Sequence, residues 1–141
     1  MKHRIHLIAC ALALCAAPVW AQPSQEEAAL SARFDACVEQ SDGSNEQLVA
    51  CAEEEFTFWD KRLNAAYKKA RQACADDACR KKLQDAQRLW IQYKEAMNAV
   101  VLRGIGSEED MVGPLNAVSF RTEETKKQTK ILERLYHSKT D

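Results

Sequence analysis

The chain has 141 residues, which suffices for one modest domain with a single core. Its 20 Lys and Arg against 21 Asp and Glu give a formal charge of −1, and this balance excludes the basic excess of a nucleic-acid-binding domain. Only 4 glycines and 3 prolines occur, far fewer than a turn-rich β-sandwich needs, so the composition favours an all-α fold.

The amino-terminal segment has the pattern of an export signal. Lys2 and Arg4 give it a positive start, and an apolar core follows over residues 5–17. Val19 and Ala21 are the small residues expected just before a cleavage site. We therefore predict a signal peptide that is cleaved after Ala21.

The predicted product is a single domain of residues 22–141 in the periplasm or outside the cell. Lipidation at Cys10 is disfavoured, because only a few apolar residues precede that cysteine. The apolar core of the signal is also too short for a membrane span, which needs about 20 residues. Removal of residues 1–21 takes away two basic residues and no acidic ones, so the remaining domain carries −3.

Two helices are predicted in the first half of this domain. A short helix over about 28–38 ends at the turn cluster 41–43. Ser44 and Gln47 then resemble a capping box, which predicts the start of a long helix. Its apolar stripe recurs at steps of three and four and consists of Leu48, Ala52, Phe56, Trp59, Leu63, Tyr67, Ala70 and Cys74.

A third helix is predicted after Asp76 and Asp77, which suit a helix start. Its stripe has the same period and consists of Leu83, Ala86, Gln87, Trp90, Tyr93, Met97 and Val101. Two long stripes joined by a short loop predict an antiparallel helical hairpin. We expect the two stripes to face each other directly.

A loop and a last helix complete the prediction of a bundle of about four helices. The loop spans 104–114 and carries Ser107, Glu108, Glu109 and Asp110. The helix runs over about 115–136 and covers the hairpin with an apolar side. That side consists of Phe120, Ile131, Leu132 and Leu135.

Four cysteines remain after cleavage, and an even number in an exported chain indicates disulfides. The spacing favours Cys37 with Cys51 and Cys74 with Cys79, because each pair closes a short segment with turn-forming residues. No paired Cys-x-x-Cys steps occur, so a zinc or thioredoxin-like redox site is disfavoured.

Asn64 and Gln87 fall in or beside the apolar stripes, where an unpaired amide is costly. In the expected hairpin these two residues lie within one turn of each other, and Asp60 lies near Lys94. We therefore expect both amides to be buried and to set the register of the hairpin. Contact with a ligand is the alternative interpretation.

Catalytic, cofactor and metal sites are all predicted to be absent. After the signal, His137 is the one histidine, and no phosphate-binding glycine loop or nucleophile motif occurs. Carboxylates such as those of 53–55 are neighbours in sequence, so on a helix they point in different directions and fit a solvated charge run.

Two segments of the chain carry a combined motif. The first has the form Asp-x-x-Leu-Asn-x-x-Tyr and the second Gln-x-x-Trp-x-x-Tyr, followed by a lysine. The matching residues are Trp59, Asp60, Leu63, Asn64, Tyr67, Gln87, Trp90, Tyr93 and Lys94. Together they resemble the signature of the lysozyme-inhibitor LprI-like family, small exported helical proteins of bacteria in which arginine is usual at the position of Lys94. The resemblance covers about 34–136.

This resemblance implies a non-enzymatic protein that binds and inhibits lysozyme in the cell envelope. Common lysozymes are strongly basic, so an acidic domain would be steered toward them, and the loop with Glu108, Glu109 and Asp110 is the candidate contact. A solvated connector is the alternative interpretation of that loop. A binding module for another envelope protein, such as an immunity or adaptor protein, is the alternative function, and an enzyme is a weaker third.

Overall fold

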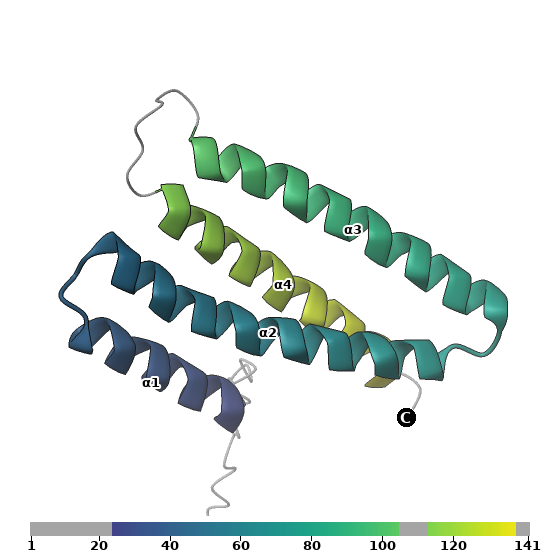
Figure 1. Cartoon of the computed structure of the whole chain (residues 1–141). Coiled ribbons are helices and arrows are strands. Elements are labelled where there is room, and N and C mark those ends of the chain that lie inside the picture. The colour runs from purple at the N-terminus through teal and green to yellow at the C-terminus, as the bar shows by residue number, and fades with distance from the viewer. Residues whose placement is uncertain (1–23, 105–112, 138–141) are drawn as a thin grey trace, which may run out of the picture.

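The computed structural model describes residues 24–104 and 113–137, and these form four helices without a strand (Figure 1). The helices are α1 (Gln25–Gln40), α2 (Asn45–Ala73), α3 (Asp77–Arg103) and α4 (Gly113–His137). The predicted all-α class and the four helices are confirmed. None of the described helices is long and apolar enough to cross a membrane.

Capping side chains explain where three of the helices begin. Ser44 Oγ accepts a hydrogen bond from the backbone N–H of Gln47 at 3.4 Å, as predicted. Asp76 Oδ1 accepts one from the N–H of Cys79 at 2.7 Å, and this bond fixes the start of α3. Helix α1 begins earlier than predicted because Ser24 caps it.

Helix α4 lies between α2 and α3, whereas α1 packs on α2 (Figure 1). Helices α2 and α3 run antiparallel across a short turn, but they make few direct contacts with each other. The long hairpin exists, yet the expectation that its two stripes face each other is wrong. The stripe of α2 instead packs against α4, and α3 contacts α4 through part of its own stripe.

Small and tightly packed side chains build the seam between α2 and α4. Trp59 and Leu132 anchor it, with 1% and 0% of their surfaces exposed. Around them lie residues that allow close approach of the two helices, namely Ala52, Ala66, Ala70, Ala117, Val118, Thr122, Thr125 and Thr129. This seam is the core of the molecule.

The buried side of α4 differs from the predicted one. Leu132 is buried as expected, but Ile131 and Leu135 are 43% and 50% exposed. Threonines take their place in the core, and the hydroxyl of Thr129 donates to the carbonyl oxygen of Thr125 at 2.7 Å. Because a threonine hydroxyl can bond within its own helix, it can be buried without a partner from another helix.

Helix α3 is the least buried of the long helices. Gln87 and Lys94 are its only buried residues, although apolar residues make up much of the helix. The predicted stripe is therefore partly wrong, because Tyr93 and Met97 are 50% and 37% exposed. The narrow contact of α3 with α4 leaves one apolar flank of α3 uncovered.

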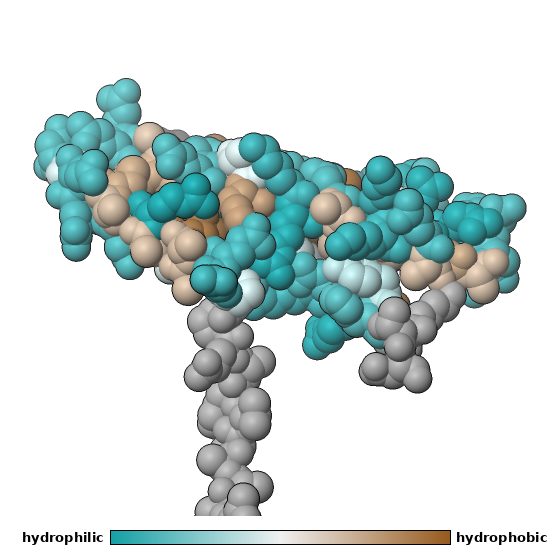
Figure 2. Space-filling view, turned by 90° about the horizontal axis from the view of Figure 1, so that it is seen from below, coloured by the Kyte–Doolittle hydropathy of each residue, from teal (hydrophilic) through white to brown (hydrophobic). Residues whose placement is uncertain are grey.

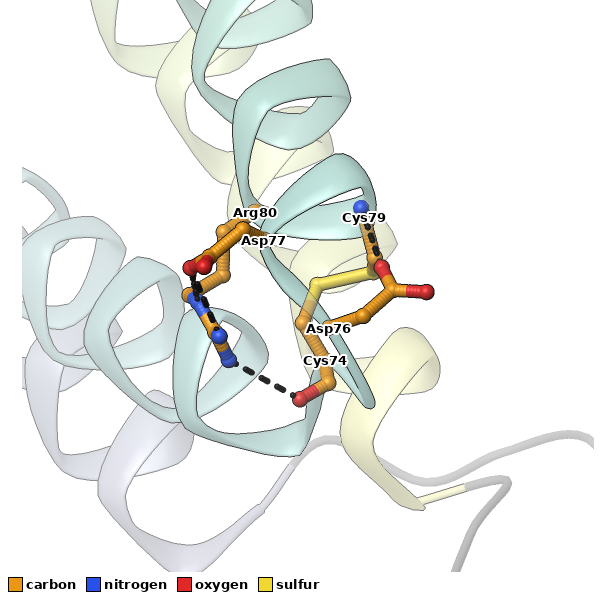
Figure 3. Close-up of a disulfide and its surroundings, with 5 residues drawn as sticks. All are labelled: Cys74, Asp76, Asp77, Cys79 and Arg80. Atoms are coloured by element: carbon orange, nitrogen blue, oxygen red, sulfur yellow. Dashed lines mark hydrogen bonds and ion pairs between the residues drawn. A yellow bond between two sulfur atoms is a disulfide. The ribbon is translucent and has the colours of Figure 1, made fainter.

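Both predicted disulfides form. Cys37–Cys51 ties α1 to the first turns of α2, with the Cα atoms 5.8 Å apart. Cys74–Cys79 closes the turn between α2 and α3, with the Cα atoms 5.5 Å apart. Figure 3 shows that Arg80 braces this turn, because its guanidinium donates to the carbonyl oxygen of Cys74 and to Asp77 Oδ1.

Candidate functional site

Trp59 lies at a junction of three helices, where Arg62 binds acidic residues from both neighbours of α2. The guanidinium donates twice to the Glu133 carboxylate, at 2.7 and 3.2 Å, and lies 3.3 Å from Glu27 Oε1. It also stacks 5.1 Å from the centre of the Trp59 ring. The hydrogen bonds that Arg62 donates to the Glu133 carboxylate raise the pKa of Arg62 above its usual value. The signature segment from Trp59 therefore helps to hold α1, α2 and α4 together.

Gln87 and Lys94 dock α3 onto the rest of the molecule. Gln87 is buried, and its Oε1 accepts a hydrogen bond from Gln128 Nε2 of α4 at 2.9 Å. The Lys94 ammonium lies 5.6 and 5.2 Å from the ring centres of Phe56 and Trp90. Both residues thus have structural roles in this arrangement.

Asn64 is exposed, so the expectation that it is buried against Gln87 is wrong. Its Nδ2 donates to the backbone oxygen and to the carboxylate of Asp60, at 2.9 and 3.1 Å. Lys94 forms its ion pair with its sequence neighbour Glu95, at 3.2 Å. Because α4 lies between α2 and α3, Gln87 pairs with Gln128 of α4 and not with Asn64 of α2.

The remaining signature residues are also either packed between the helices or exposed at the surface. Leu63 is buried in the core cluster with Leu132, and the partly buried Tyr67 and Trp90 pack against that cluster. Tyr93, on the outer side of α3, is half exposed. The signature therefore marks mainly the packing of the helices, with Asn64 and Tyr93 left at the surface.

A cleft of about 960 Å³ lies between α1 and α4, above Trp59. Its walls carry charges of both signs, and Glu27 of α1 forms an ion pair across the cleft with Lys130 of α4, at 3.6 Å. A second cleft, of about 620 Å³, lies beside the Cys74–Cys79 disulfide and is lined mostly by small apolar residues. Figure 2 shows apolar atoms at this end and over α1, on a face that is otherwise mainly hydrophilic.

Charge is separated along the long axis of the molecule. Residues 33–55 contain one basic and seven acidic residues, whereas 61–82 contain eight basic and two acidic ones. The acidic residues are Asp35, Glu39, Asp42, Glu46, Glu53, Glu54 and Glu55. Because α2 runs the length of the molecule, one end is acidic and the end with the α2–α3 turn is basic (Figure 1). A count by segment predicts this separation, which the net charge of the whole chain conceals.

The acidic end is also where the segment 105–112 is attached. Gly104 ends α3 with φ +69° and Gly113 begins α4. An added Cβ at Gly113 would lie 2.5 Å from the carbonyl oxygen of Leu102, so the two attachment points are in close contact. The predicted contact residues Ser107, Glu108, Glu109 and Asp110 lie outside the described residues.

These features define a small, disulfide-linked helical protein with oppositely charged ends. Within 24–104 and 113–137, no group of three side chains could hold a metal ion. A family model described as "Lysozyme inhibitor LprI" matches residues 37–132. The chain therefore belongs to the LprI lysozyme inhibitor family, which is an inhibitor family and not an enzyme family. No curated protein and no solved structure matches it.

Proposed function

We propose that the protein inhibits lysozyme in the bacterial cell envelope by binding the enzyme directly. Membership of the LprI family is the observation that carries the proposal. Export by the signal of residues 1–21, with cleavage after Ala21, is part of it, because the disulfides need an oxidising compartment.

The acidic end is the proposed docking surface. Five of the acidic side chains of 33–55 are exposed there, and Glu108, Glu109 and Asp110 belong to the segment attached at the same end. A basic enzyme is attracted to such a surface over distances of about 8 Å at physiological salt. The substrate cleft of lysozyme is lined by carboxylates, so the inhibitor would block access to the cleft sterically. Its acidic residues would contact the basic surface around the cleft.

A turbidity assay with the purified domain of residues 22–141 tests the proposal. We expect it to stop the clearing of a cell-wall suspension by a basic lysozyme at near-stoichiometric amounts. Unchanged clearing at a large molar excess, together with capture of one stoichiometric envelope protein, would overturn lysozyme inhibition in favour of a binding module. Turnover of a substrate by the protein alone would support an enzyme instead.

A further inference from the structure

Helix α3 carries an exposed apolar ridge on one flank, beside the side that contacts α4. Leu89, Tyr93 and Val100 are 67%, 50% and 45% exposed. With Ala86 and Ala96, which are also exposed, they recur at alternating steps of three and four residues. This spacing is the heptad pattern of a helix that packs along another helix. We call the five residues the α3 ridge.

We infer that the α3 ridge is a homodimer interface, in which the α3 helices of two copies pack antiparallel about a two-fold axis. The axis would cross α3 between Lys94 and Glu95. Residues whose numbers add to about 189 would then face each other across the interface. A two-fold interface requires one surface to be complementary to itself, and the α3 ridge has this property.

Side-chain sizes support this register. Tyr93 would face Ala96 of the second copy, so that the largest residue of the ridge meets one of the smallest. Leu89 would face Val100, and each of these contacts occurs twice because of the symmetry. Alternation of large and small residues across facing positions is what allows two helices to interdigitate.

The ends of the ridge are complementary in charge. Asp85 and Arg103 flank it, and they are 18 residues apart, which places them on the same line along the helix after five turns. In the antiparallel arrangement Asp85 of each copy lies within a turn of Arg103 of the other. Within one copy the Asp85 carboxylate already binds Lys81 at 2.8 Å, so Arg103 would join an existing ion pair.

The charge separation of the whole molecule favours the same orientation. Antiparallel packing brings the acidic end of one copy beside the basic end of the other, whereas parallel packing brings like ends together. The contact is about 25 Å of helix, from the rise of 1.5 Å per residue over 86–103. An interface of this length lies at the small end of stable interfaces, so we expect a dimer that forms with increasing concentration.

Sedimentation of the domain of residues 22–141 over a range of concentrations tests the inference. Leu89→Glu should raise the dimer dissociation constant about 30-fold or more, because the symmetry places the charge in the interface twice. Ile91→Glu is the matched control, since Ile91 is 44% exposed on the same helix but lies off the ridge. This control should dimerise normally, and at a concentration where all three proteins are monomeric both variants should melt as the unchanged protein does.

A charge exchange tests the antiparallel register. Asp85→Arg or Arg103→Asp alone should weaken the dimer, and the double variant should restore it. A monomer at about 1 mM protein, or a dimer that survives Leu89→Glu, would overturn the inference. Loss of lysozyme inhibition in Leu89→Glu, with the parent protein monomeric, would assign the α3 ridge to the enzyme instead.

Discussion

The seam between α2 and α4 and the outer flank of α3 contain similar apolar periodicities but differ in burial. In the seam, Trp59 and Leu132 are closed to solvent, and alanines and threonines let the helices approach. On the flank of α3, Leu89 and Tyr93 remain largely open. Periodicity thus shows that a helix has an apolar side. Which other helix covers that side depends on how closely the side chains of the two helices pack.

The largest contrast between the two regions is expected from truncation of one large apolar residue in each. Trp59→Ala should lower the free energy of unfolding by about 3–5 kcal/mol, because it opens a cavity in a packed core. Leu89→Ala should change it by less than about 0.5 kcal/mol, because two-thirds of that side chain is already exposed. Urea denaturation at a concentration where the protein is monomeric measures both, and equal losses would contradict the division into core and open flank.

The disulfide that closes the longer loop should contribute more to the free energy of unfolding. Replacement of Cys37 and Cys51 by serine removes a link with a sequence separation of 14, for which the loop-entropy model gives about 3 kcal/mol. The Cys74–Cys79 link has a separation of 5 and should contribute about 2 kcal/mol. Denaturation of the two double-serine variants checks the order. A larger loss at the α2–α3 turn would show that this turn is strained without its link.

Replacement of the buried Gln87 and of the exposed Asn64 compares the inner and outer sides of the hairpin with smaller expected effects on stability. Gln87→Leu should cost about 1–3 kcal/mol, because it leaves the Gln128 amide without its buried acceptor. Asn64→Leu should cost less than about 0.5 kcal/mol, because Asn64 is exposed and bonded only within α2. Thermal melting of both variants tests this, and equal destabilisation would restore the interpretation in which both amides set the register.

Local signals in the sequence predict the helices well. Ser44 and Asp76 mark two helix starts, Gly104 marks an end, and the cysteine spacing gives both disulfides. These features depend on neighbours in the chain. The position of α4 could not be predicted in the same way, because it depends on close packing of Thr125 and Thr129 against α2, and threonine carries no strong core signal.

Only part of the candidate site could be predicted from the sequence. The signature residues Trp59 and Leu63 could be assigned to the core because they fall on a regular stripe. Arg62, which links three helices through Glu27 and Glu133, gives no signal in a single sequence, because both of its partners are far away along the chain. The acidic end is evident only once the charges are counted segment by segment.

The most direct test of docking through the acidic end is the salt dependence of the association rate with a basic lysozyme. Replacement of Glu108, Glu109 and Asp110 by serine should leave the melting temperature unchanged, slow association and flatten its salt dependence. Serine at the exposed Lys68 and Lys82, toward the basic end, is the control and should not slow association. An unaltered rate and salt dependence in the acidic variant, with inhibition intact, would contradict docking through this segment.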